Sequence, residues 1–266
     1  MSLLSDSALD FLRSVFSSRS KEDAETDRTL VTLTFAQSLD AKIAGKGGRQ
    51  LLLSCPESML MTHWMRSMHD AILVGIGTAL NDNPQLNTRL IPEASRPSKL
   101  PRPIVLDAHL RLPIDCKLLS NFRQGVGLQP WIFCSSSNFP EMSSRRSTLL
   151  EAGAVIFDVP CEDGFLSIPQ VLVELYIQGI KSLMVEGGAT IINSFLKCSQ
   201  QSDGFGAPPV IDTIIITTAP MFVGDGGVGY EVGGSKQAEE APALQPVQTA
   251  LMGIDTVAAV RILRRQ

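Results

Sequence analysis

The sequence lacks the cysteine spacing of a disulfide framework or a zinc site. Its five cysteines are scattered along the chain, odd in number, and form no C-x-x-C or C-x-x-H pair. Reduced, buried thiols in a cytosolic protein are the interpretation that this pattern favours. No metal site is therefore predicted.

Basic clusters and long hydrophobic runs are also scarce. The chain has 23 Lys and Arg against 27 Asp and Glu, and a formal net charge of −4. This balance argues against a protein that binds nucleic acid or a membrane surface. No stretch approaches the roughly 20 apolar residues of a membrane span. Asp6 and Asp10 interrupt the N-terminal segment, so no signal peptide is expected and a cytoplasmic location is predicted.

What the chain does contain is enough apolar residues for a substantial core, 44% of 266 residues, arranged in short runs. Buried strands are predicted at 30–39, 70–78, 102–107, 130–136, 154–159, 182–188, 211–220 and 256–264. Helices are predicted at 7–17, 57–69, 142–152, 168–178 and 189–198. Strands that alternate with helices predict an α/β fold with a mostly parallel sheet covered on both faces, and with an antiparallel strand at the C-terminal end.

The pattern predicts one domain. Residues 1–28 are expected to form an N-terminal helix and a charged linker, and residues 29–266 a single domain. Three segments lack a core pattern and are predicted to be loops or insertions: 91–101, 199–209 and 224–249.

The stretch "LMVEGGATIINSFL" carries the strongest site signal. A hydrophobic strand ends in Glu186, two glycines follow, and a helix begins at once. A helix N-terminus with glycine beside it suits a phosphate, because its N–H groups are unpaired and no Cβ blocks the approach. An ordinary strand-to-helix turn is the alternative, since the spacing is not G-x-G-x-x-G. Glu186 favours a site, because a carboxylate that closes a hydrophobic strand is costly unless it faces a cleft or a partner.

Two further strand ends carry polar groups. In "VGIGTALNDNPQLNTR", Thr78 and Asp82 are four residues apart and could share one face of a helical turn. The alternative is that Thr78 only caps a helix and Asp82 is solvated. In "AQSLDAKIAG", Lys42 could bind phosphate or polarise a reacting group, or it could be an ordinary surface lysine. The three histidines are poor candidates for catalysis, and structural or solvated roles are expected for them.

These segments together, with "RPIVLD" and "IDTIIITTAPMFVG", resemble the riboflavin-biosynthesis reductases. The resemblance covers residues 30–264 and is strongest to the fungal 2,5-diamino-6-ribosylamino-4(3H)-pyrimidinone 5′-phosphate reductases, which are related to the C-terminal domain of the bacterial bifunctional deaminase/reductase. It implies a three-layer α/β/α fold like that of dihydrofolate reductase, a homodimer, and NADPH. The implied reaction reduces the ribosylamino group of a small-molecule substrate to a ribitylamino group, with hydride going to ribose C1′ of the ring-opened imine.

The resemblance also implies site residues. Those implied to contact the cofactor are Thr78, Asp82, Ala108, Val159, Gly187, Gly188, Ala189 and Thr190. Lys42 and Glu186 are implied to be catalytic, near the substrate. Arg66, Leu86 and Arg89 are implied to contact the substrate, and an arginine pair would suit its 5′-phosphate.

The chain departs from the family pattern in places. Ala41 stands where glycine is common, and Ala108 stands where bacterial relatives have serine. The H-x-E and P-C-x-x-C ligands of a zinc deaminase are missing, so a reductase without deaminase activity is expected.

The sequence leaves two alternative functions open. The first is another NADPH-dependent pteridine or folate reductase on the same fold. A folate site would need a carboxylate on a helix early in the chain, and Glu57, at the start of the predicted helix 57–69, is the candidate. The second is a non-catalytic nucleotide-binding protein, which would have no need of a carboxylate on the substrate side.

Overall fold

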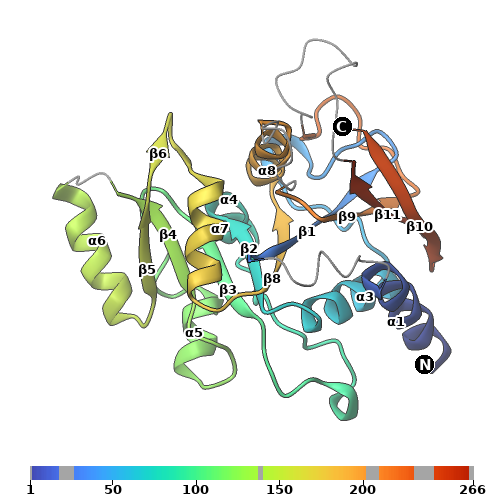
Figure 1. Ribbon diagram of the computed structural model, residues 1–266, viewed down its shortest axis with the longest axis horizontal. Coiled ribbons are helices and arrows are strands. Elements are labelled where there is room, and N and C mark those ends of the chain that lie inside the picture. Colours follow the sequence, from blue (N-terminus) through green and yellow to red (C-terminus); the bar gives the residue numbers. More distant parts are fainter. Residues whose placement is uncertain (1, 18–26, 137–139, 202–209, 231–242, 264–266) are drawn as a thin grey trace.

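The computed structural model describes residues 2–17, 27–136, 140–201, 210–230 and 243–263. Within them a nine-stranded sheet has the order β10-β11-β9-β1-β8-β2-β3-β4-β5 (Figure 1). The strands are β1 (Leu30–Ser38), β2 (Ala71–Gly75), β3 (Arg102–Leu106), β4 (Trp131–Ser135), β5 (Val155–Val159), β8 (Ser182–Gly187), β9 (Thr213–Ala219), β10 (Leu244–Met252) and β11 (Asp255–Ile262). A short hairpin of β6 (Cys161–Glu162) and β7 (Phe165–Leu166) stands apart.

The sheet is parallel except at one edge. β1 pairs in parallel with β8 and β9, and β2, β3, β4 and β5 continue in parallel on the other side. β11 pairs antiparallel with both β9 and β10. The predicted α/β class, with a mostly parallel sheet and an antiparallel C-terminal strand, is confirmed.

Helices cover both faces, because successive side chains of each strand point to opposite sides. Val31 and Leu33 of β1 pack in a core with α7 (Ile168–Ile177) and α8 (Ala189–Gln201). The opposite core contains side chains of α1 (Ser2–Ser17), α3 (Pro56–Ser67), α4 (Ile76–Asp82), α5 (Lys117–Arg123) and α6 (Pro140–Glu151). The result is a three-layer α/β/α arrangement. None of the helices in the described residues combines the length and the apolar character that a bilayer span needs.

The predicted strands and helices are present with ends shifted by a few residues, and the exceptions have physical causes. The run 70–78 was predicted as one strand, but the chain becomes helical at Ile76 and forms α4. The segment 224–249 was predicted as a loop, yet β10 begins at Leu244. β10 is an edge strand with a mostly exposed surface and a register shift between Pro246 and Gln248, so it lacks the apolar pattern of a core strand.

Parts of three predicted segments lie outside the described residues: 18–26 of the linker, 202–209 of the second insertion and 231–242 of the third. Residue 264 of the last strand is outside them as well. The division into a helix with linker and one domain stays a prediction. Phe11 and Leu12 of α1 are nevertheless buried in the core that α3 shares.

Candidate active site

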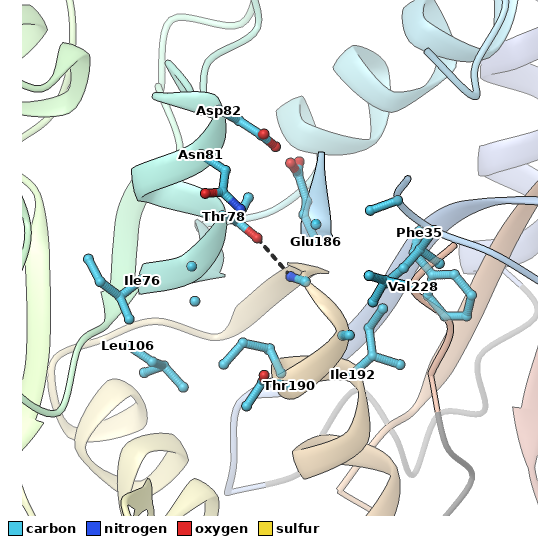
Figure 2. Close-up of a pocket in the computed structure, with 18 of the residues that line it drawn as sticks. Phe35, Ile76, Thr78, Asn81, Asp82, Leu106, Glu186, Thr190, Ile192 and Val228 are labelled. Carbon is cyan, nitrogen blue, oxygen red and sulfur yellow. Dashed lines mark hydrogen bonds between the residues drawn. The ribbon is translucent and has the colours of Figure 1, made fainter. Parts of the chain in front are cut away.

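A cavity of about 760 Å³ opens at the edge of the sheet where the parallel strands end (Figure 2). Its wall is built from the segments that follow β1, β2, β3 and β8, and from the β6–β7 hairpin. Ligands in open α/β sheets bind at the carboxyl ends of the strands. The volume is in the range of known small-molecule and cofactor sites.

The corner between β8 and α8 forms the centre of this wall. β8 ends at Gly187, the Gly187–Gly188 peptide is cis, and α8 begins at Ala189. The N–H of Gly188 donates to Thr78 Oγ1 at 2.9 Å (Figure 2). A Cβ on Gly188 would lie 3.0 Å from that oxygen, and Gly187 has φ +94°, which favours glycine. The N–H groups of Ile191 and Ile192 donate to the carbonyl of Gly188. Those of Ala189 and Thr190 precede them at the start of the helix, where N–H groups lack a partner within the helix and suit an anion.

The interpretation in which Thr78 only caps a helix is wrong. The residue before α4 is Gly75, and no side chain caps that end. The Thr78 hydroxyl instead supports the glycine corner, 110 residues further along the chain.

Glu186 lines the cavity and is held by Arg66 of α3. Arg66 Nε donates to Glu186 Oε1 at 2.6 Å, and a terminal nitrogen donates to Oε2 at 2.8 Å. The other terminal nitrogen donates to the carbonyl of Asn87 at 3.1 Å. The two side chains are only 11% and 16% exposed, so the ion pair compensates the cost of burying both charges. Burial opposes the charge on Arg66, but the attraction and hydrogen bonds of Glu186 outweigh it and raise the pKa of Arg66.

Asp82, the last residue of α4, is directed into the same part of the cavity as Glu186 (Figure 2). Burial raises the pKa of Asp82 above its ordinary value. Figure 2 also shows Asn81 beside it, a lining residue that the sequence analysis missed. Its position three residues after Thr78, on the same face of one helix, is the signal that could have found it.

The raised pKa of Asp82 makes a prediction for stability. A carboxyl group whose pKa is higher in the folded than in the unfolded state lowers stability once pH exceeds the unfolded value. Asp82→Asn removes this cost, so the free energy of unfolding near pH 7 should rise above that of the wild type. The gain should disappear as pH falls below about 4, the ordinary pKa of aspartate. Urea denaturation at both pH values measures it, and a gain that persists in acid would contradict the assignment.

Some of the other predicted residues line the cavity and some are buried in the cores. Ala108, Ala189 and Thr190 line the cavity. Val159 is 3% exposed and Leu86 is 2% exposed; both side chains belong to the apolar cores.

Lys42 lies beside the cavity and is not among its lining residues, although the adjacent Ile43 and Ala44 are. A Cβ on Gly227 would lie 2.8 Å from Lys42 Cγ, so the lysine side chain runs against that glycine loop. Ala41, where the family pattern has glycine, has φ +56°, a conformation that glycine adopts at lower cost.

Arg89 extends the charged cluster of Arg66 and Glu186. Its side chain is exposed and donates to Asn87 Oδ1 at 3.0 Å. Burial and then the nearby charge of Arg66 lower the pKa of Arg89. Burial and the two arginines also lower the pKa of His63 to about 3, so this histidine is neutral. Glu186 is bonded to Arg66, whereas its charge acts on Arg89 from a longer distance.

Comparisons with known proteins give the same family of reductases, and the matches extend over most of the chain. The family model "RibD C-terminal domain" matches residues 29–258. A 2,5-diamino-6-ribosylamino-4(3H)-pyrimidinone 5′-phosphate reductase of Debaryomyces hansenii is 37% identical over 231 residues, which are 85% of this chain and 89% of the relative. A protein of the same name from Candida glabrata is 35% identical over 207 residues, 76% and 78% of the two chains. The structure of the riboflavin biosynthesis reductase Rib7 of Saccharomyces cerevisiae superposes with a TM-score of 0.68 at 26% identity, and covers 96% of this chain and 98% of its own.

Proposed function

The chain belongs to the RibD C-terminal domain family, and on this basis we propose that it reduces 2,5-diamino-6-ribosylamino-4(3H)-pyrimidinone 5′-phosphate to the ribitylamino compound in riboflavin biosynthesis, with NADPH as cofactor. The observation that carries the proposal is that the glycine corner and Glu186, whose carboxylate is bonded to Arg66, line one cavity in a chain similar to named reductases over most of its length. A homodimer and a cytoplasmic location stay predictions.

The residues of the cavity fit a nicotinamide dinucleotide. Gly188 leaves room where a side chain would meet Thr78, and the first turn of α8 offers N–H groups to phosphate oxygens. We assign the pyrophosphate to Gly187, Gly188, Ala189 and Thr190, and further cofactor contacts to Thr78, Asp82 and Ala108. Val159 is left out of this site, because its side chain is buried and its carbonyl accepts a hydrogen bond from the N–H of Ser136. When bound, NADPH supplies the hydride.

Glu186 is proposed to stabilise the positive charge of the substrate iminium group. Its carboxylate lies in the cavity wall, and the bidentate contact with Arg66 fixes its orientation before substrate arrives. Lys42 is proposed to serve the opened sugar, either as a proton donor to the ring oxygen or as a hydrogen-bond donor to the hydroxyl groups. Much of the remaining rate enhancement is expected from the positioning of the two reactants.

The cluster of Arg66, Arg89 and His63 is proposed to attract the 5′-phosphate. Burial and then repulsion by Arg66 lower the pKa of Arg89, and a bound anion would offset both effects. The guanidinium group of Arg66 is already bonded to Glu186 and to the Asn87 carbonyl. Arg89 is therefore the arginine with donors to spare, and the buried Leu86 fixes the loop that carries it.

Arg89→Ala is expected to raise KM for the phosphorylated substrate about 10- to 100-fold, because charge-assisted hydrogen bonds to the phosphate are lost. The kcat should change little. The same variant assayed on the dephosphorylated substrate should differ from wild type much less. Arg13→Ala, a change at an exposed arginine of α1, is the control. An equal loss on both substrates would argue against phosphate binding by Arg89.

Oxidation of NADPH, followed by absorbance, tests the proposed function against its rivals. Oxidation should depend on the diamino-ribosylamino-pyrimidinone phosphate and should not occur with dihydrofolate. Glu57, the carboxylate that a folate site would need, is not among the described residues that line the cavity. Oxidation with dihydrofolate alone would favour the pteridine reductase, and binding of NADPH without oxidation by either substrate would favour the non-catalytic protein.

A further inference from the structure

A loop from the other end of the chain, residues 221–229, lies beside Lys42. Val228 of this loop lines the cavity (Figure 2). The N–H of Ile43 donates to the carbonyl of Val228 at 2.8 Å, and the N–H of Val228 donates to the carbonyl of Ala44 at 2.8 Å. Ile43 and Ala44 line the cavity as well. The loop and the segment after β1 therefore form one piece of the wall, with Lys42 at its edge.

The side chain of Lys42 runs along two glycines of the loop. A Cβ on Gly227 would lie 2.8 Å from Lys42 Cγ, and a Cβ on Gly229 would lie 4.0 Å from Lys42 Nζ. Within the described part of the chain, the ammonium group has no hydrogen-bond or ion-pair partner. The contact of its methylene groups with the loop is therefore what sets its direction.

Asp40, two residues before Lys42, ties the loop to the segment after β1. Its Oδ2 accepts a hydrogen bond from the N–H of Gly224 at 2.7 Å, and its Oδ1 accepts one from the N–H of Val223 at 3.1 Å. The hydroxyl of Ser38 donates to Asp40 Oδ1 at 2.5 Å and accepts from the N–H of Lys42 at 3.0 Å. One carboxylate thus joins the loop to the turn that carries the lysine.

The hydrogen bonds to Asp40 keep its carboxylate charged. The bond from the Ser38 hydroxyl, and then the bond from the N–H of Gly224, lower the pKa of Asp40 to about 2. The attachment therefore persists at the pH of any enzyme assay. The N–H of Gly227 donates to the carbonyl of Gly224 at 3.0 Å. The residue that Asp40 holds is thus bonded to the glycine against which the lysine lies.

We propose that Asp40 is a positioning residue for Lys42: it fixes the 221–229 loop against the lysine side chain, and the loop directs the ammonium group. This inference rests on the proposed function, in which Lys42 serves the opened sugar. A lysine side chain is flexible, and a reacting group is effective only when it is held in the productive geometry. Asp40 acts through Lys42 and is not among the described residues that line the cavity.

Steady-state kinetics of the full-length enzyme test the proposal. Asp40→Ala should lower kcat about 10- to 100-fold and leave KM for NADPH within about twofold, because a small misplacement of a reacting group has an effect of this size. Asp40→Asn keeps an acceptor for the loop and should lose less. Added to Lys42→Met, Asp40→Ala should lower kcat by less than about twofold more. Asp225→Asn, at an exposed aspartate of the same loop, is the matched control and should behave like the wild type.

Two adjacent glycines test the contact from the side of the loop. Gly227→Ala places a methyl group against the lysine side chain and should lower kcat about 10-fold. Gly226→Ala meets nothing closer than 4.0 Å and should leave kcat unchanged. Thermal melts show which variants are folded. Should Asp40→Ala fail to fold, Asp40→Asn and Gly227→Ala carry the test.

Acetylation of lysines in the folded protein measures the position of Lys42 without turnover. Peptides are analysed by mass spectrometry, and the rate at Lys42 is compared with the rate at the exposed Lys117. Asp40→Ala should raise the relative rate at Lys42 at least about threefold, because a released side chain is more accessible, and Asp225→Asn should not.

Three results would overturn the proposal: an unchanged labelling rate at Lys42 in Asp40→Ala, an unchanged kcat in that variant, or an equal loss of kcat with and without Lys42. A wild-type protein that does not reduce the pyrimidine would contradict the proposed function instead. The labelling rates would then still decide whether Asp40 positions the lysine.

Discussion

Glu186→Gln is expected to lower kcat by about two to three orders of magnitude, while the dissociation constant for NADPH stays within about threefold. Glutamine keeps the shape of the side chain but cannot stabilise the positive charge of an iminium group. In the proposed assignment the cofactor contacts the glycine corner and the residues after β2 and β3, so its affinity should not depend on this carboxylate. Steady-state rates and nucleotide titration on the same preparation measure the two quantities.

The same substitution should reduce stability, because Arg66 would keep a buried charge without a partner. Loss of one member of a buried ion pair costs about 3 to 5 kcal/mol. Arg66→Gln should cost a similar amount, and the double variant Arg66→Gln with Glu186→Gln should be more stable than the sum of the two losses predicts. Rates are therefore to be measured at a temperature where each variant is folded. Collapse of NADPH affinity with an unchanged kcat would contradict the role given to Glu186.

Gly188→Val is expected to weaken NADPH binding about 30- to 300-fold, the equivalent of losing one or two charge-assisted hydrogen bonds. Even a Cβ at this position lies 3.0 Å from Thr78 Oγ1, and a valine would also occupy the space through which a phosphate approaches the backbone. The hydrogen bond from Gly188 to Thr78 and the first turn of α8 would both be displaced.

The matched control for this corner is Gly226→Ala. A Cβ there meets nothing closer than Lys46 Cβ at 4.0 Å, so the substitution adds a methyl group at a glycine without crowding it. Titration with NADPH and a thermal melt of each variant separate lost binding from lost folding. A folded Gly188→Val protein that binds NADPH like the wild type would rule out the corner as the phosphate site.

The elements that local patterns determine could be predicted from the sequence. Buried strands such as β2 and β8 are continuous apolar runs, and the turn after Glu186 is marked by two glycines and a helix start. β10 could not be found in this way, because an exposed edge strand has no apolar pattern. The hairpin of β6 and β7 has strands of two residues each, too short to show any period.

Single residues of the site could be predicted from the sequence, but the contacts between them could not. The resemblance placed Arg66 at the substrate, but its bidentate contact with Glu186 joins residues 120 positions apart, and only the folded sheet brings them together. The bond between Thr78 and Gly188 joins residues 110 positions apart, so no local pattern could indicate it. Arg111, which lines the cavity after β3, was not among the predicted residues, because an arginine after a strand is ordinary until the cavity that it lines is known.

Transfer of deuterium from NADPH labelled at C4 of the nicotinamide tests the central claim most directly. The enzyme is incubated with each of the two C4-deuterated stereoisomers and the diamino-ribosylamino-pyrimidinone phosphate, and the product is examined by mass spectrometry and NMR. One stereoisomer should give a ribitylamino product with a single deuterium, located at C1′. A product that is unlabelled with both stereoisomers, or labelled at another carbon, would contradict the account.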